Sequence, residues 1–137
     1  MKSVQIVAPG HIHAVWPVVR GLLNTAIINY DYADYDVEHL KVLLVKEFQV
    51  LFVVLEDNNI VGAFTVEVIT YPNHRVAHTT TMGGKGLFDK NTVSQYEEWC
   101  VSNGITKIRA YAQDAQARLF KMKLGLNVVT HVVEKTL

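Results

Sequence analysis

The stretch that decides the fold comprises residues 50–82 and reads VLFVVLEDNNIVGAFTVEVITYPNHRVAHTTTM. Its opening run, VLFVVL, is β-branched, aromatic and aliphatic throughout, as in a strand buried on both faces. Asp57-Asn58-Asn59 then predicts a tight turn, because Asn and Asp tolerate positive φ. Residues 60–70 and 75–82 are expected to be strands, joined by a turn over residues 71–74. The stretch therefore predicts three sequential hairpin strands.

The chain before this stretch predicts one strand and two helices. Residues 4–8 form a short strand candidate that ends at Pro9-Gly10. Apolar residues then recur at helical spacing over residues 12–27. Pro17 is expected near the start of that helix, where its missing N–H costs little. Asp36 is a good N-cap for a second helix, whose apolar face carries Val37, Leu40, Leu43 and Leu44.

Beyond the stretch, helices and strands alternate. Asp89 is placed to cap a helix through residue 101, stopped by Asn103-Gly104. Residues 105–111 alternate as a strand, and Asp114 is expected to cap a helix closed by Gly125. Residues 126–133 are expected to form a last strand, which, if it lies at a sheet edge, makes a homodimer plausible.

The resulting order, β-α-α-β-β-β-α-β-α-β, predicts an α/β (α+β) fold. Three hairpin strands followed by β-α-β-α-β give a mixed β-sheet with helices on both faces. A Rossmann domain is excluded, because it would alternate strand and helix from the first strand onward.

Composition narrows the class of protein. A chain of 137 residues predicts a single domain over residues 1–137. Half of the residues are hydrophobic and 19% are charged, which excludes a disordered chain. Lys+Arg and Asp+Glu are 13 each, so the zero net charge argues against nucleic acid or membrane partners that bind through bulk charge.

The cysteine content and the N-terminal sequence bear on the compartment. Cys100 is the one cysteine and cannot form an intrachain disulfide, which favours a reducing compartment. The N-terminus shows no basic region leading into an apolar core, and no apolar run approaches the length of a membrane span. A cytoplasmic protein is therefore expected. On the apolar stripe of its helix, Cys100 is expected to be a buried small hydrophobe rather than a nucleophile.

Two C-terminal segments carry a family resemblance. Residues 95–105, QYEEWCVSNGI, resemble the helix that follows the CoA loop in the GNAT superfamily of N-acetyltransferases. Residues 114–126, DAQARLFKMKLGL, resemble the family segment Asn-x-x-Ala-(x)6-Leu-Gly-Phe, with Ala117, Leu124 and Gly125 in place and Asp114 where Asn is usual. The first third of the chain matches only in element order. The small size and incomplete motifs also resemble GNAT-like proteins encoded by bacteriophages, which would place the protein in host cytoplasm or a virion.

The resemblance implies acetyl-CoA as cofactor, although the pyrophosphate loop departs from the family pattern. The positions of Gln/Arg-x-x-Gly-x-Gly/Ala fall here on Gly86, Asp89 and Asn91, so two glycines are lost and an acid stands at the helix start. Glycines occur slightly before these positions, at Gly83 and Gly84, and Lys85 and Lys90 supply positive charge. The residues expected to bind the cofactor are Thr81, Met82, Gly83, Gly84, Lys85, Gly86, Lys90, Asn91 and Asp114. A plain turn at residues 83–86 is an equally open interpretation.

Catalytic roles follow from the same resemblance. Relatives polarise the thioester carbonyl with a backbone N–H on the fourth strand, which corresponds to residues 80–83 here. Where many relatives carry a Tyr beside the thiolate leaving group, this chain carries Lys121. Glu67 and His78 are the candidates for the base, and His78 titrates near neutrality. By alternation Glu67 shares a face of its strand with Thr65 and Ile69. The alternative interpretation is that its side chain points to solvent.

An acidic and aromatic loop precedes the second predicted helix. It lies where the acceptor-binding loop of the family falls, and its candidate substrate-binding residues are Tyr30, Asp31, Tyr32 and Asp34. Carboxylates among tyrosines suit a cationic amine, through charge and cation–π contact. A helix-capping linker is the alternative. His11-x-His13 has no third ligand nearby, so a loop leading into a helix is favoured over a metal site.

Two functions thus remain open at the level of sequence. The first is an acetyl-CoA-dependent N-acetyltransferase acting on an amine-bearing substrate. The second is a catalytically inactive GNAT-fold protein, a viral structural or host-interaction protein that acts through contacts with a protein partner.

Overall fold

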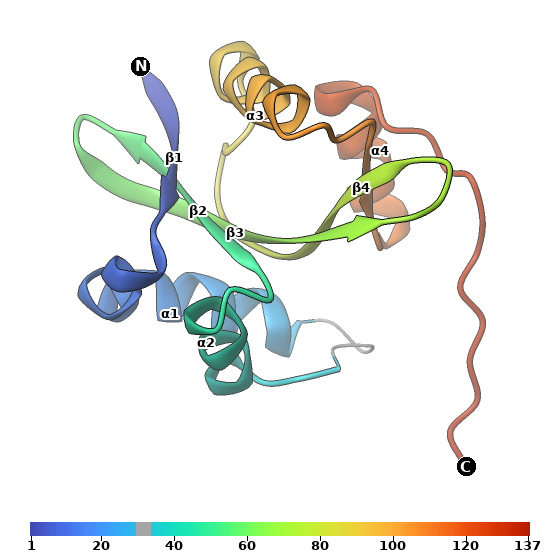
Figure 1. Ribbon diagram of the computed structural model, residues 1–137, viewed down its shortest axis with the longest axis horizontal. Helices are drawn as coiled ribbons and strands as arrows, with labels where there is room; N and C mark the ends of the chain where they lie inside the picture. Colours follow the sequence, from blue (N-terminus) through green and yellow to red (C-terminus); the bar gives the residue numbers. More distant parts are fainter. Residues whose placement is uncertain (30–33) are drawn as a thin grey trace.

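The computed structural model describes residues 1–29 and 34–137. A five-stranded mixed sheet has the order β1-β2-β3-β4-β5, in which the first four strands are antiparallel and β5 runs parallel to β4 (Figure 1). The strands are β1 (Lys2–Val7), β2 (Val50–Glu56), β3 (Asn59–Thr70), β4 (Arg75–Gly84) and β5 (Lys107–Ala110). The helices are η1 (Pro9–His11), α1 (Ile12–Ile28), α2 (Val37–Val45), α3 (Lys90–Ser102) and α4 (Asp114–Leu124).

The predicted fold class is confirmed, including the hairpin strands β2, β3 and β4 and a mixed sheet with helices on both faces. The order of elements is confirmed as far as α4. Two local expectations are corrected. Pro17 lies in the second turn of α1, because the helix already begins at Ile12. The N-cap of α4 is Gln113, which shares a capping box with Gln116, so Asp114 is the first residue of that helix.

The predicted last strand over residues 126–133 is wrong. The residues after Gly125 form no helix or strand, and most of their side chains are exposed. Gly125 adopts the left-handed conformation that ends α4, and the chain then runs away from the sheet (Figure 1). A β-branched sequence becomes a strand only where it meets a sheet edge to pair with, and this segment meets none.

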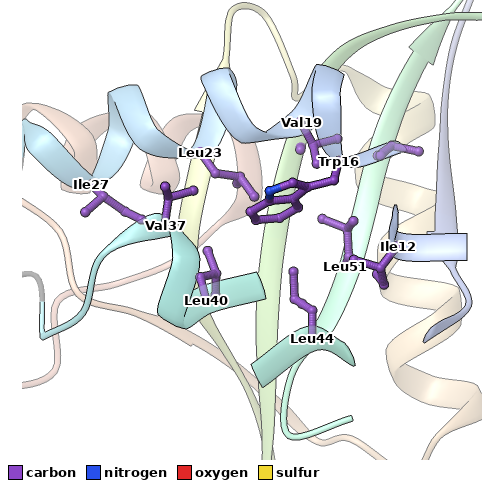
Figure 2. Close-up of a cluster of buried hydrophobic side chains, with 11 residues drawn as sticks. Ile12, Trp16, Val19, Leu23, Ile27, Val37, Leu40, Leu44 and Leu51 are labelled. Carbon is purple, nitrogen blue, oxygen red and sulfur yellow. The ribbon is translucent and has the colours of Figure 1, made fainter. Parts of the chain in front are cut away.

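One apolar cluster fills the space between the sheet and the helices α1 and α2 (Figure 2). Both helices present their apolar stripes to the face of the sheet that carries Leu51 and Val53. Trp16 lies within this cluster, with Lys41 Nζ 5.7 Å from the centre of its ring. This face of the sheet is therefore closed over β2 and most of β3.

A second cluster lies under α3 on the opposite face. Phe52 and Phe64 stack with ring centroids 4.9 Å apart, and Tyr96 and Trp99 of α3 pack against Phe52 edge-on. Cys100 belongs to this cluster, where burial raises the pKa of its thiol to about 11. The expectation that Cys100 is buried in the core is confirmed.

Among the described helices none combines the length and hydropathy needed to cross a bilayer, α1 being the longest with 17 residues.

We predict opposite effects for two glycine substitutions. A Cβ at Gly83 would stand 2.1 Å from the carbonyl oxygen of Leu22, because α1 crosses β4 there at backbone contact. Gly83→Ala is expected to lower the free energy of unfolding by about 1–3 kcal/mol. Gly21, in α1, has nothing within 4 Å of such a Cβ, so Gly21→Ala is expected to raise stability by about 1 kcal/mol. Urea unfolding curves measure both, and equal midpoints for the two variants would contradict the close approach.

Candidate functional site

The site begins where β4 and β5 separate. Their parallel pairing extends from Val76↔Lys107 to Thr79↔Ala110, after which β5 ends while β4 continues to Gly84. At the same level β4 carries a β-bulge against β3, since Val66 pairs with Thr79 and Thr65 pairs with Thr81. Thr80 is therefore the extra residue. A bulge bends its strand and increases the local twist, which turns the end of β4 away from β5.

Buried polar side chains hold the bulge in place. Thr80 Oγ1 donates to Gln49 Oε1 at 2.6 Å, and Thr65 Oγ1 lies 2.6 Å from Thr80 Oγ1. Gln49 Nε2 in turn donates to the hydroxyl of Tyr35 at 3.4 Å. Gln49 and Thr65 are buried, so loss of any one partner would leave an unsatisfied polar group. The network thus ties the bulge to the segment that precedes α2.

A cleft of about 260 Å³ opens beside the bulge, on the α1 and α2 face of the sheet. Its lining combines titratable and hydroxyl side chains with a few apolar ones. The lining residues are Ile27, Asp34, Tyr35, Gln49, Glu67, Ile69, His78, Thr79, Thr80, Thr81, Met82, Ala110, Tyr111 and Phe120. Within the described residues, no group of three or more His, Cys, Asp or Glu side chains is placed to hold a metal ion.

Glu67 and His78 face each other across β3 and β4. They are register partners, so both side chains project to the same face of the sheet, into the cleft. The ring of Tyr111 packs against that of His78, with centroids 4.7 Å apart. Burial lowers the pKa of His78, and Arg109 lowers it further, whereas the charge of Glu67 raises it. The imidazole is therefore neutral at pH 7 and able to accept a proton.

The structure brings part of the sequence-predicted site together. Glu67, His78, Thr81, Met82 and Asp34 all line the cleft, and Glu67 is half-buried there rather than exposed to solvent. Lys121 lies exposed in the last turn of α4, outside this lining, where its neighbour Phe120 points into the cleft. Asp114 is exposed at the start of α4 and does not line the cleft. The acceptor candidates Tyr30, Asp31 and Tyr32 lie outside the described residues.

The predicted cofactor loop is held by β1. The carbonyl oxygen of Gly86 accepts from Lys2 Nζ, and Asn91 Nδ2 donates to the carbonyl of Lys2 at 2.6 Å. Gly84 has positive φ at the end of β4, and Gly83 accommodates Leu22, so both glycines have structural roles. Lys85 and Lys90 are exposed beside this loop.

Asp89 occupies the N-terminus of α3. Its carboxylate accepts from the backbone N–H of Thr92 at 2.8 Å, and Thr92 Oγ1 caps in return. The hydrogen bond from the Thr92 backbone N–H is the main cause that holds the pKa of Asp89 below its usual range. The carboxylate is thus charged and fills the position where a phosphate would meet this helix dipole.

The residues that line the cleft without having been predicted from the sequence include Tyr35, Gln49 and Tyr111. Tyr35 and Gln49 flank α2 and reach the cleft only because α2 packs over the end of β3 and β4. Tyr111 follows β5 and faces the cleft because β4 and β5 part at that level. Tyr35 belongs to the acidic and aromatic loop that the sequence analysis proposed for the acceptor, although it was not among the residues named there. Gln49 follows α2 in a polar segment that carries no distinctive pattern.

We predict a pH-dependent contribution of His78 to stability. Because burial lowers its pKa in the folded protein, the unfolded chain binds the extra proton first as the pH falls below about 6.5. The free energy of unfolding of the wild type should therefore decrease relative to His78→Gln as the pH falls from 7 to 5. Urea unfolding at a series of pH values measures this difference. A constant difference between the two proteins would contradict a buried, neutral imidazole.

Comparison with known proteins identifies the fold. No protein-family model matches the sequence, and no curated protein matches it. Solved structures match over essentially the whole chain. An aminoglycoside acetyltransferase from an uncultured soil metagenomic sample, in complex with sisomicin, has a TM-score of 0.71 at 17% identity, covering 99% of this chain and 96% of that one.

Two further solved structures are similar. A predicted acetyltransferase from Clostridium acetobutylicum, solved with acetyl-CoA, has a TM-score of 0.63 at 16% identity over 99% of this chain and 96% of that chain. A ribosomal-protein-alanine N-acetyltransferase from Brucella melitensis has a TM-score of 0.63 at 13% identity over 100% and 98%. The chain therefore has the GNAT acetyltransferase fold, as the sequence predicted, with a sequence far diverged from these structures.

Proposed function

We propose that this protein transfers the acetyl group of acetyl-CoA to a cationic amine such as a lysine, a protein N-terminus or a polyamine. The observation that carries the proposal is the Glu67–His78 pair, which lines a cleft at the level where β4 bulges and leaves β5. A neutral base can deprotonate the amine, and a strand segment without a partner on one side can polarise the thioester carbonyl through its backbone N–H groups.

The end of β4 fits the acyl donor. Residues 80–84 continue beyond the last pair with β5, so on that side their backbone has no strand partner among the described residues. The pantetheine arm of CoA carries amides and can add to such a segment as an extended chain. Thr81 and Met82 lie at the cleft and are the residues beside which the thioester would lie, with a β4 backbone N–H polarising its carbonyl.

The diphosphate of CoA fits the N-terminus of α3 less closely than the pantetheine arm fits β4. Asp89 already caps α3, and Asn91 and Gly86 are engaged by Lys2, so the helix N-terminus offers little to a phosphate. The positive charge at this end comes from the exposed side chains of Lys85 and Lys90. Binding of CoA would therefore rest on the strand and on these lysines, and should weaken with salt.

The acceptor side of the cleft is acidic. Asp34 and Glu67 both line it, and an ammonium group is attracted to such a site by charge and by the rings of Tyr35 and Tyr111. His78 removes a proton from the ammonium and releases it to solvent, and the free amine nitrogen attacks the thioester carbonyl carbon. His78 then accepts the second proton, which the nitrogen loses as the tetrahedral adduct collapses to the amide. As the C–S bond breaks, the thiolate needs a proton. Tyr111 lines the cleft and Lys121 does not, so we assign the proton donor to Tyr111, which His78 can then reprotonate.

The test combines ligand binding with turnover. Acetyl-CoA at 100 times its Kd should stabilise the protein by about 2.7 kcal/mol, seen as an upward shift in thermal unfolding. Thiol release with spermidine or a lysine peptide should fall about a hundredfold or more in His78→Gln. His74→Gln is the control, because His74 lies in an exposed turn away from the cleft, and it should keep full activity.

Two results would overturn the proposal. No shift at millimolar acetyl-CoA would remove the donor and leave the alternative, a catalytically inactive protein acting through protein contacts. Turnover that is unchanged in His78→Gln would keep the activity but remove the assigned base.

A further inference from the structure

A pair of cations lies beside the proposed base, one strand further along the sheet. Lys107 and Arg109 flank Ile108 in β5, and Ile108 packs against the cluster under α3. Because successive side chains of a strand point to opposite faces, both cations lie on the face that carries the cleft. The pairing of the strands agrees, since Arg109 is the register partner of His78, which in turn is the partner of Glu67. An acid, a base and a cation thus form one row across β3, β4 and β5.

The charges of this pair are not neutralised by a carboxylate within the described residues. The ion pairs found there lie around α2 and involve neither Lys107 nor Arg109. The Cζ atom of Arg109 lies 6.0 Å from the centre of the Tyr71 ring, a cation–π contact that holds the guanidinium on this face. Burial is the main cause that lowers the pKa of His78, and the charge of Arg109 lowers it further. The field of the guanidinium therefore reaches the base.

This part of the face is accessible from the cleft. The helix α1 crosses β4 at Gly83, and the hairpin that joins β3 and β4 reaches beyond α1 and α2 (Figure 1). Lys107 is exposed, Arg109 is half-buried, and Tyr71 is 40% exposed. A molecule bound in the cleft can therefore extend across β4 and β5 toward the hairpin.

We propose that Lys107 and Arg109 bind a carboxylate of the acceptor, so that the preferred acceptor is an acidic peptide rather than a polyamine. The proposal rests on acetyl transfer in the cleft and narrows its substrate. Neighbouring strands lie about 4.8 Å apart, and residues two apart in one strand are separated by roughly 6.6 Å. An amine beside His78 thus has the two cations roughly 5–10 Å away, which one or two residues of extended peptide span.

The two ends of the site carry opposite charges, which selects the orientation of the acceptor. Asp34 and Glu67 line the cleft and attract the ammonium group, whereas Lys107 and Arg109 attract the carboxylate. A polyamine would place a second ammonium group against the two cations, and this repulsion disfavours it.

The first experiment measures binding in the absence of acetyl-CoA. The amidated peptides Ala-Glu-Ala and Ala-Gln-Ala are nearly isosteric and differ in charge. Each is titrated into the isotopically labelled protein, and amide chemical shifts give the Kd. The Glu peptide should bind about tenfold more tightly, because its carboxylate makes charge-assisted hydrogen bonds, and added salt should reduce this preference. N-acetylated Lys-Glu and Lys-Gln amides make the same comparison for a lysine side chain.

Variants locate the carboxylate site. Lys107→Gln, a change at an exposed position, should lower the preference for Glu, and its combination with Arg109→Gln should abolish it. Arg109→Lys keeps the charge and should retain part of the preference. Arg118→Gln is the matched control, because Arg118 is exposed on α4 and does not line the cleft. Equal affinities for the two peptides, no binding of either, or a preference that survives in the double variant would overturn the proposal.

Turnover separates this proposal from the acetyl transfer on which it rests. With acetyl-CoA present, kcat/KM should show the same preference of about tenfold for Glu over Gln, and spermidine should be the poorer acceptor. The binding preference without turnover of any acceptor would contradict the acetyl transfer and leave the carboxylate site standing. Spermidine turned over faster than the Glu peptides would overturn the assignment of the acceptor.

Discussion

The β-bulge at Thr80 is the constraint on which the rest of the structure depends. One extra residue in β4 shifts its pairing register with β3 at the level where β5 stops. The partly buried hydrogen bonds from Thr80 to Gln49, and between Thr65 and Thr80, make the bulge costly to straighten. The cleft that Phe120, Tyr111 and Met82 border opens at this same level. The position of the cleft thus follows from the geometry of the strands, and the side chains that line it only adjust its shape.

The charges that balance to zero in the composition are separated in space. Carboxylates of Asp34 and Glu67 lie at the cleft, where a cation would approach His78, the proposed base. Exposed lysines, Lys85 and Lys90, lie beyond the far end of β4. This separation suits a reaction that joins a cationic acceptor to an anionic donor. The carboxylate of Asp89 places a negative charge at the donor end, against this separation. Binding of an anionic donor would therefore depend more on the two lysines and on the β4 backbone.

Much of the fold follows from patterns in the sequence, because those patterns report burial directly. The run over residues 50–55 is buried, and the apolar stripes of α1, α2 and α3 face the sheet as expected. The tail shows the limit of such reasoning. Its valines have the same β propensity as those of β2, yet β2 lies between two strands whereas the tail pairs with no strand. The site was only half predictable for a related reason. Glu67 and His78 carry chemistry in their residue types, but Tyr35, Gln49 and Tyr111 enter the cleft through packing that no local pattern encodes.

The most direct test of the account is to map where acetyl-CoA contacts the protein. Amide chemical shifts of the isotopically labelled chain, followed through a titration with acetyl-CoA, report each backbone position separately. The account predicts the largest changes at residues 79–85 of β4 and its exit, with smaller ones at Tyr111 and Lys90, and none in α2. Saturable shifts confined to another surface, or no shifts at all, would contradict the claim that the separation of β4 from β5 creates the donor site.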